Sequence, residues 1–379
     1  MAHETMATPT RSSRRRGRMG LRLALLGGTL AAIAILGLAG LEIGLRVTDA
    51  LAVARARTQA GVAGDAEGFW AVYDPDMVYR LRPGRGRVNL QGFLGDPVSR
   101  GAQPHPFRLL VLGDSVGYYG DGPRDTYVDH LSEALRSDPR LAPVEIVNSS
   151  TPGYTDWQEL QWLRKFGLAL EPDLVAVAFV LNDLHHTLHG FRIENGRIVG
   201  DTHRLSAETE ARVSNPLIRL GRRSRAVLWL KDRLTILGSL AEMLAGDAYT
   251  FEYRPDFSNA WQSAAWLPVE RQLSEMMQLG REHGFRLVVW VFPYAQQLRE
   301  DYLARDRDYV LYPQRRLKAI CEGLGIPFLD LYSSLAHPES FLDDDVHLSP
   351  VGRVAAAAPI ARFLSRARLI RARSEASGG

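Results

Sequence analysis

Short apolar runs alternate with longer amphipathic segments between residues 107 and 370. The apolar runs have the length and composition of buried strands. They occupy residues 108–112, 144–147, 174–180, 286–291 and 327–331. The segments with apolar positions at helical spacing occupy residues 126–136, 156–166, 269–283, 315–324 and 350–369. Strands that alternate with helices predict an α/β fold, in which a parallel sheet of about five strands is covered by helices on both faces.

Two features interrupt this pattern. Pro359 lies inside the last helical segment, and we expect it to kink or break that helix. Residues 186–261 are too many for a simple connection and predict an insertion. It contains a hairpin pattern at residues 191–199, with Asn195-Gly196 at the turn, and a helical pattern at residues 224–244. That helix either packs on the core or forms a lid or membrane-facing element near the functional site.

The N-terminal segment has the pattern of a membrane anchor. No charged residue occurs from Leu23 to Leu41, close to the ~20 residues that a helix needs to cross a bilayer. Arginines precede this segment at positions 11, 14, 15, 16, 18 and 22, which favours a cytoplasmic N-terminus. We predict a cytoplasmic basic tail at residues 1–22 and a transmembrane helix at residues 23–47. The alternative is a cleaved signal peptide, for which Ala52-Val53-Ala54 and a weak twin-arginine pattern at Ser13-Arg14-Arg15 are the signals.

The remaining boundaries follow from composition. Residues 48–105 contain many Gly, Pro and Arg residues and predict a membrane-proximal linker and N-terminal extension. Residues 106–370 form the main domain, and residues 371–379 a disordered tail. The net charge of +3 arises from the N-terminal arginines, so no nucleic-acid partner is expected. The single cysteine, Cys321, lies on an apolar helical face and predicts a buried thiol.

A candidate nucleophile follows the first predicted strand, which ends in Gly113-Asp114-Ser115. Ligand sites of open α/β sheets form at the carboxyl ends of strands. A serine hydroxyl is a weak nucleophile and needs a base within hydrogen-bonding distance. Gly-Asp-Ser is also ordinary turn composition, so the tripeptide alone decides little.

A candidate base lies near the other end of the chain. His347 comes just before Ser349-Pro350, which opens the last helix. Asp344 can place its carboxylate on one imidazole nitrogen and leave the other facing Ser115. Asp343 and Asp345 are competing partners for the imidazole. The acidic loop lacks the spacing of a calcium site, and we predict no metal.

Candidate hydrogen-bond donors follow the second and third strands. Gly153 can bring its main-chain N–H close to a substrate, and Asn182 can offer its side-chain amide. With the N–H of Ser115 they would form an oxyanion hole, which stabilises the negative charge of an acyl-transfer transition state. Asp114 and Asp183, the neighbours of Ser115 and Asn182, are candidate supporting residues.

These blocks resemble the SGNH/GDSL hydrolase superfamily. The order Gly113-Asp114-Ser115, Gly153, Asn182-Asp183 and Asp344-x-x-His347 matches that superfamily over about residues 107–368. The anchor and the Tyr73-Asp74-Pro75 segment resemble its membrane-anchored bacterial members. Two positions depart from the pattern, because Val116 follows the serine and Val180 stands where glycine is frequent.

The resemblance implies a three-layer, flavodoxin-like fold without a cofactor. It implies that Ser115 is the nucleophile, His347 the base and Asp344 its orienting acid, with Ser115, Gly153 and Asn182 as the oxyanion hole. The predicted localisation is the bacterial cell membrane, with the catalytic domain extracytoplasmic.

Three functions are compatible with these residues. The first is an esterase that removes an acyl group such as acetyl from a cell-envelope glycan or lipid through an acyl-enzyme. The second is an O-acyltransferase that acts on an extracytoplasmic polysaccharide with the same residues. The third is a non-catalytic glycan-binding protein.

Overall fold

The computed structural model describes most of the chain from residue 70 to residue 370. The described residues are 25, 27–29, 32–33, 36–48, 70–98, 106–184, 188–194, 197–204, 224, 226–227, 229–230, 233, 249–254 and 257–370. The chain divides into two compact units. One comprises residues 1–64 and 209–241, and the other residues 65–208 and 242–379.

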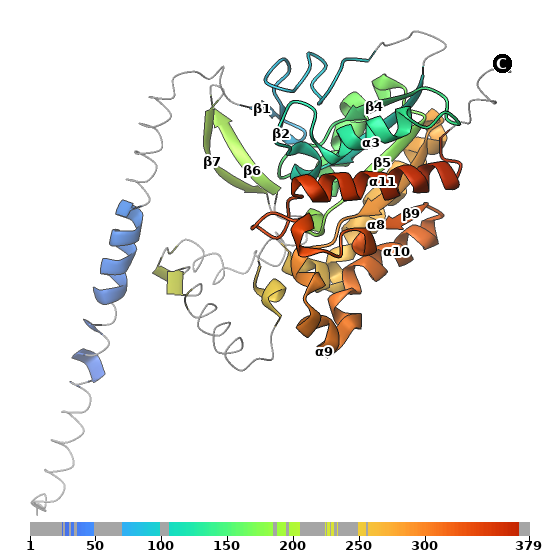
Figure 1. Ribbon diagram of the computed structural model, residues 1–379. Coiled ribbons are helices and arrows are strands. Elements are labelled where there is room, and N and C mark those ends of the chain that lie inside the picture. Colours follow the sequence, from blue (N-terminus) through green and yellow to red (C-terminus); the bar gives the residue numbers. More distant parts are fainter. Residues whose placement is uncertain are drawn as a thin grey trace, which may run out of the picture. The chain divides into compact units, whose positions relative to one another are not determined.

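The larger unit is built on a five-stranded parallel sheet, as predicted (Figure 1). Its strands are β3 (Phe107–Gly113), β4 (Val144–Asn148), β5 (Leu174–Phe179), β8 (Arg286–Val291) and β9 (Phe328–Asp330). They are arranged in the order β4-β3-β5-β8-β9. This order is that of a flavodoxin-like doubly wound sheet, whose direction of winding reverses between β3 and β5. The crevice at that reversal is where such sheets bind ligands.

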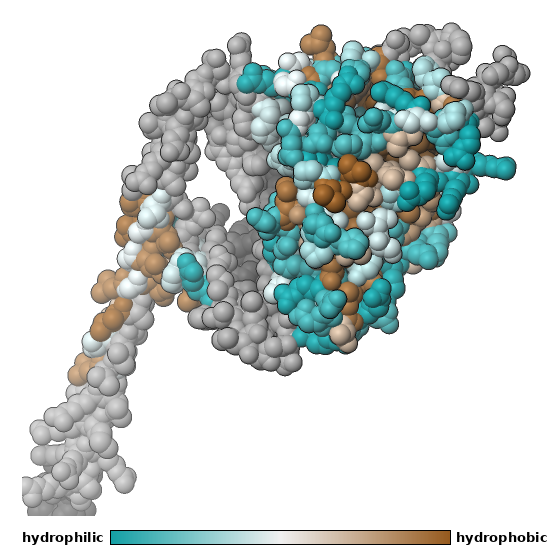
Figure 2. Space-filling model, in the orientation of Figure 1, coloured by the Kyte–Doolittle hydropathy of each residue, from teal (hydrophilic) through white to brown (hydrophobic). Residues whose placement is uncertain are grey.

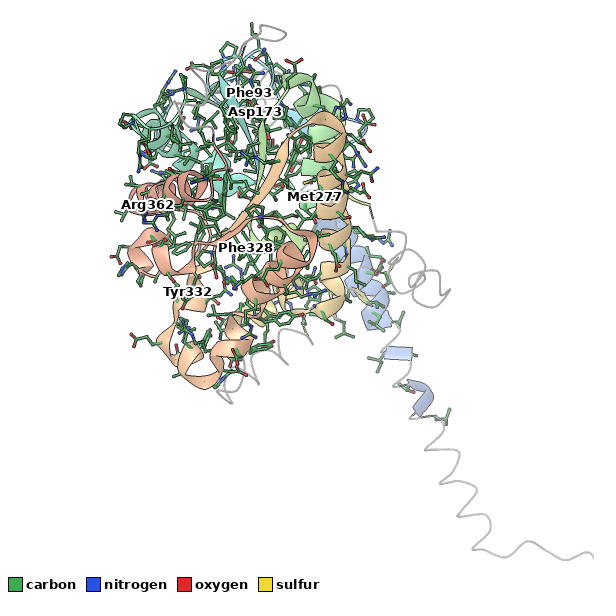
Figure 3. All side chains as sticks on the ribbon, turned by 90° about the vertical axis from the view of Figure 1, so that its right-hand side faces the viewer. Phe93, Asp173, Met277, Phe328, Tyr332 and Arg362 are labelled. Carbon is green, nitrogen blue, oxygen red and sulfur yellow. The ribbon has the colours of Figure 1, made fainter. Side chains whose placement is uncertain are left out.

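Helices cover both faces of the sheet. They are α3 (Tyr127–Arg136), α4 (Asp156–Trp162), α8 (Trp266–His283), α10 (Tyr312–Leu324) and α11 (Pro350–Arg366). Alternate strand residues point to opposite faces: Leu109 and Val111 lie in the core beneath α3 and α11, and Leu110 and Leu112 in the core beneath α4, α8 and α10. Figure 3 shows this layering, with Phe328 of β9 between Arg362 of α11 and Met277 of α8.

The five helices predicted between the strands and after the last strand are all present, with differences at their ends. α4 continues into a π-helical turn, η2 (Leu163–Gly167). α11 runs through Pro359 and ends at Arg366, so it does not break at the proline. Two helices were not predicted, α2 (Ser115–Tyr118) and α9 (Glu300–Val310). α9 buries only Tyr302 and Val310 and so has no apolar stripe to predict it.

Smaller elements surround the sheet. β1 (Ala71–Asp74) and β2 (Val78–Leu81) form an antiparallel hairpin, and β6 (Leu188–Glu194) pairs antiparallel with β7 (Arg197–Arg204). The second pair confirms the predicted hairpin, whose turn lies outside the described residues. Short 3-10 turns are η3 (Leu168–Leu170), η4 (Leu181–Leu184), η5 (Thr250–Tyr253), η6 (Ser258–Trp261), η7 (Ser263–Ala265), η8 (Ala295–Leu298), η9 (Tyr332–Ser334) and η10 (Pro338–Ser340).

The smaller unit contains a helix over residues 36–48 with exposed hydrophobic side chains (Figure 2). In this unit the Glu42 carboxylate accepts hydrogen bonds from the Ser224 hydroxyl (2.9 Å) and the Ala226 N–H (2.8 Å). None of the helices in the described part of the chain combines the length and the hydropathy needed to cross a bilayer. Parts of residues 23–47 and most of residues 224–244 lie outside that part, so the anchor and the form of the inserted helix stay predictions.

Cys321 is fully buried in the core, as predicted. Burial raises the pKa of its thiol to about 12. At neutral pH it is therefore a neutral apolar side chain and not a nucleophile.

Candidate active site

Ser115 opens a one-turn helix at the carboxyl end of β3. The Asp114 carboxylate caps this helix and accepts a hydrogen bond from the Val116 N–H (2.8 Å). Gly117 lets the helix pack closely on the next loop, because a Cβ there would lie 2.1 Å from the Ser150 hydroxyl oxygen. The turn is therefore fixed on both sides, and it presents Ser115 at the edge of the sheet.

The structure brings His347 onto Ser115 and Asp344 onto His347. The imidazole Nε2 lies 2.8 Å from the Ser115 Oγ, and Nδ1 lies 2.5 Å from the Asp344 Oδ2. The second oxygen of Asp344 accepts hydrogen bonds from the N–H groups of Val346 (3.0 Å) and His347 (2.9 Å). Imidazole and carboxylate are thus held in the orientation that proton transfer from the serine requires.

Of the three neighbouring aspartates, Asp344 is the one on the imidazole. Its pKa lies below the ordinary value: burial opposes ionisation, but the hydrogen bonds from the His347 ring and from the two N–H groups outweigh it. Asp345 turns away with a positive φ of 67°. Its carboxylate instead accepts a hydrogen bond from the Gln296 amide (3.1 Å).

Two of the predicted oxyanion donors are main-chain N–H groups at the sheet edge. Gly153 has a φ of +75°, and a Cβ there would lie 2.8 Å from the Tyr79 hydroxyl oxygen. Within the described residues, the N–H groups of Ser115 and Gly153 donate to no other group. Both are therefore available to a substrate oxygen.

Asn182 follows β5 and reaches the same edge. Its Nδ2 donates to the Asp114 Oδ2 (3.0 Å), which fixes the amide, and its second N–H has no acceptor among the residues that the structure describes. Asp183 closes the turn beneath it by accepting a hydrogen bond from the Val180 N–H (2.8 Å). The valine at position 180 therefore does not remove Asn182 from the site.

Tyr79 of β2 supports the Gly153 loop, a role that no pattern in the sequence predicts. Its hydroxyl donates to the Pro152 carbonyl (2.6 Å) and is itself fully buried. Tyr154 returns a hydrogen bond to the Tyr79 carbonyl (2.7 Å). An isolated tyrosine in a short strand is common, and only the folded chain shows that this one lies behind a candidate oxyanion donor.

Tyr119 forms an exposed wall beside the imidazole. Its ring meets the His347 ring edge-on, with centroids 5.0 Å apart and planes at 89°. The side chain is 46% exposed.

Three buried acids lie behind the site on α4 and η4. Burial raises the pKa of Asp156 to about 7. Burial is the main cause that raises the pKa of Glu159 well above its ordinary value, and the nearby Asp156 and Asp114 carboxyls add to it. Burial is also the main cause that raises the pKa of Asp183. Neither oxygen of Glu159 has a hydrogen-bond partner in the described structure. A neutral Glu159 avoids placing a bare charge in the core.

The described residues include no group of three or more His, Cys, Asp or Glu side chains placed to hold a metal ion. A separate cavity of about 520 Å³ lies between α3, β4 and the loop that contains Asp96. Ser115, His347 and Asp344 are not among the residues that line it. This cavity is therefore separate from the candidate active site.

A three-layer α/β fold with a serine, a histidine and an aspartate in contact at one edge of its sheet is the arrangement of a hydrolase that acts on ester bonds. The chain matches the model of the GDSL-like lipase/acylhydrolase family over residues 111–354, more than half of its length. It belongs to that family, which confirms the predicted superfamily and reaction class; membrane anchoring stays a prediction.

Comparison with solved structures gives matches of low sequence identity. A lipase/acylhydrolase from Enterococcus faecalis is 17% identical, with a TM-score of 0.38, and the match covers 68% of this chain and 94% of that one. A putative acylhydrolase from Bacteroides fragilis is 14% identical, with a TM-score of 0.38 and coverage of 71% and 91%. A catalytic mutant of an acetylxylan esterase from Geobacillus stearothermophilus is 14% identical, with a TM-score of 0.39 and coverage of 70% and 95%. A comparison with curated protein sequences gives no significant match.

Replacement of Gly153 by alanine should lower kcat for an ester substrate by about 10²-fold, the effect of losing one oxyanion donor. The new Cβ meets the Tyr79 hydroxyl and must displace the N–H. Steady-state kinetics measure this change. Gly325→Ala is the matched control, because Gly325 also has a positive φ (+71°) but open space around it. Equal kcat values for both variants would contradict the role of Gly153.

The Glu159→Gln variant should be more stable than the wild type at neutral and alkaline pH. The folded-state pKa of Glu159 is raised, so the free energy that its protonated side chain contributes to folded-state stability is fully present below the pKa of the unfolded state. It is lost as the pH rises from about 4.5 toward the folded pKa. Glutamine stays neutral, so the difference in Tm should grow from near zero at acid pH to a few degrees at pH 8. Thermal unfolding at several pH values tests this, and a Tm difference independent of pH would contradict it.

Proposed function

We propose that the protein is a serine esterase that removes an acyl group, acetyl in the simplest case, from a cell-envelope glycan or lipid. The observation that carries this proposal is the unbroken series of contacts from Ser115 through His347 to Asp344. A serine at hydrogen-bonding distance from an imidazole that is itself oriented by a carboxylate is the arrangement that activates the hydroxyl.

The proposed reaction has two halves. His347 Nε2 takes the Ser115 proton as Oγ attacks the ester carbonyl carbon. The carbonyl oxygen becomes an oxyanion that faces the N–H groups of Ser115 and Gly153 and the Asn182 amide. Collapse breaks the ester C–O bond, and the leaving alcohol takes the proton from His347. Water then attacks the acyl-serine with the same base, which releases the carboxylic acid and restores Ser115.

The open surroundings of the imidazole favour an ester substrate whose alcohol portion is bulky and extends toward solvent. The His347 and Asp344 side chains are 24% and 46% exposed, so the base side of the site is open to solvent. Tyr119 offers an exposed ring beside it, on which the C–H face of a sugar can pack. An acylated glycan fits such a site, with the small acyl group placed at Ser115 and the sugar on the tyrosine.

The Ser115→Ala variant should lose turnover of p-nitrophenyl acetate by at least about 10³-fold and should no longer react with a fluorophosphonate probe. Mass spectrometry of the labelled wild type should find the adduct on Ser115. Ser150→Ala is the control, because this neighbouring hydroxyl is buried without a partner in the described structure. Turnover that survives in Ser115→Ala would overturn the nucleophile. An unlabelled, folded wild type would favour a non-catalytic glycan-binding protein.

The same assay separates hydrolysis from transfer. With an oligosaccharide added, a hydrolase releases free acetate and leaves the oligosaccharide unchanged. Net acetylation of the oligosaccharide would instead assign the O-acyltransferase reaction, in which a sugar hydroxyl replaces water in the second half.

We also propose that residues 23–47 anchor the protein in the bacterial cell membrane, with the catalytic domain outside. The arginine cluster and the uncharged segment from Leu23 to Leu41 support this orientation. The full chain, tagged at its C-terminus, should stay with membranes after an alkaline wash, and protease added to spheroplasts should remove the tag. A shortened, soluble product would indicate a cleaved signal peptide instead.

A further inference from the structure

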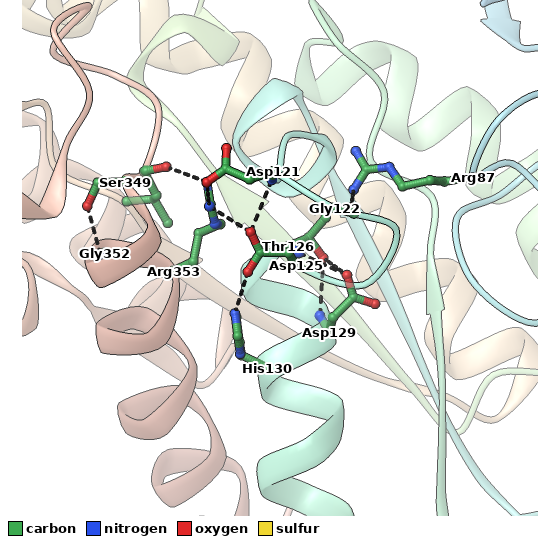
Figure 4. A network of polar contacts seen from close by, with 11 residues as sticks. Arg87, Asp121, Gly122, Asp125, Thr126, Asp129, His130, Ser349, Gly352 and Arg353 are labelled. Atoms are coloured by element: carbon green, nitrogen blue, oxygen red, sulfur yellow. Dashed lines mark hydrogen bonds and ion pairs between the residues drawn. The ribbon is translucent and has the colours of Figure 1, made fainter.

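Arg353, on the first turn of α11, links the loop that carries His347 to the loop that follows Ser115 (Figure 4). Its Nη1 donates to the carbonyl of Leu348, the residue after His347 (3.1 Å). Its Nη2 donates to the carboxylates of Asp121 (2.5 Å) and Asp125 (2.7 Å). The arginine side chain is only 2% exposed. A charged group is thus buried beside the site without touching the candidate catalytic atoms.

The first turn of α11, from which the Arg353 side chain extends, is tightly packed. Ser349 caps α11, and its hydroxyl also donates to the Glu339 carbonyl (2.5 Å). Gly352 packs so closely that a Cβ there would lie 1.9 Å from the Ser340 carbonyl oxygen. The first turn of α11 therefore has one position relative to the His347 loop, and the guanidinium projects from a fixed point.

The loop on the other side is ordered by its own contacts. Asp125 accepts further hydrogen bonds from the Asp121 N–H (3.0 Å) and pairs with His130 Nε2 (3.0 Å). Arg87 donates to the Gly122 carbonyl (3.2 Å). The same loop begins with Tyr119, whose ring contacts His347 directly. Besides the Ser115–His347 hydrogen bond, the tyrosine ring and the guanidinium therefore hold the His347 loop against the Ser115 side.

We infer that Arg353 is a positioning residue, which keeps His347 in register with Ser115 through the Leu348 carbonyl and the Asp121 and Asp125 carboxylates. This inference rests on the proposed function. Burying an ion pair generally adds little stability, because desolvation offsets the attraction, so stability alone is a weak reason for a buried arginine here. A planar guanidinium can hold a carbonyl and two carboxylates at once, which a lysine ammonium on a flexible stem cannot do in the same geometry. A displacement of about 1 Å at the reacting atoms can cost 10²-fold in rate.

The experiment compares Arg353→Lys with Arg108→Lys in the full-length protein. Arg108 is a matched control, since it is 1% exposed, pairs with Glu145 (2.7 Å) and donates to the Leu170 carbonyl, but lies at the opposite end of β3 from Ser115. With p-nitrophenyl acetate, Arg353→Lys should lower kcat by about tenfold or more at nearly unchanged KM. The rate of fluorophosphonate labelling should fall in parallel. Arg108→Lys should lower Tm and leave both rates near wild type.

Asp121→Asn gives a second, independent test. The Asp121 side chain is 70% exposed, so the variant should fold. The loss of one carboxylate weakens the interaction that holds the Arg353 guanidinium in place. A severalfold lower kcat with an unchanged Tm supports the inference. If the wild type is active and both Arg353→Lys and Asp121→Asn keep the wild-type kcat, the positioning role of Arg353 is overturned and the proposed function is not. If Arg353→Lys does not fold, Asp121→Asn decides. A wild type inert to ester and probe would contradict the proposed function itself.

Discussion

The hydrogen bond between Ser115 and His347 joins residues 232 positions apart. No local preference can form such a contact, so it exists only while two loops on different elements keep a fixed separation. The parallel sheet supplies the coarse part of this placement, since it brings the ends of β3, β4 and β5 to one edge. The precise separation of the two loops is set by side chains that contact both of them. Tyr119 and Arg353 are the two that the structure places there.

Support for the site comes partly from outside the family-matched region. The match begins at residue 111, yet Tyr79 lies behind Gly153, and Arg87 holds the loop after α2 at Gly122. Both residues belong to the N-terminal extension. Its hairpin therefore does more than connect segments: it shapes the backbone that faces the substrate.

The acids around the site have opposite electrostatic roles. Asp344 is kept ionised by hydrogen bonds, which suits a carboxylate that must stabilise an imidazolium. Glu159 and Asp183 are pushed toward their neutral forms by burial. A neutral pair beneath the oxyanion donors adds no negative charge where negative charge develops in the reaction. The difference arises from environment alone, because the side chains are chemically alike.

Apolar runs and helical spacing predict the sheet, most of its helices and the residues that meet at its edge, because these patterns record which positions are buried. Parallel strands then bring their ends together whatever the intervening loops contain. The sequence pointed to Asp344 but left Asp343 and Asp345 as competitors, and only the tertiary structure shows which carboxylate contacts the imidazole, since that depends on the backbone angles of one loop, including the positive φ at Asp345. The tertiary structure alone revealed Tyr79, Arg353 and helix α9. These depend on contacts between distant segments or bury too few side chains to leave a periodic pattern.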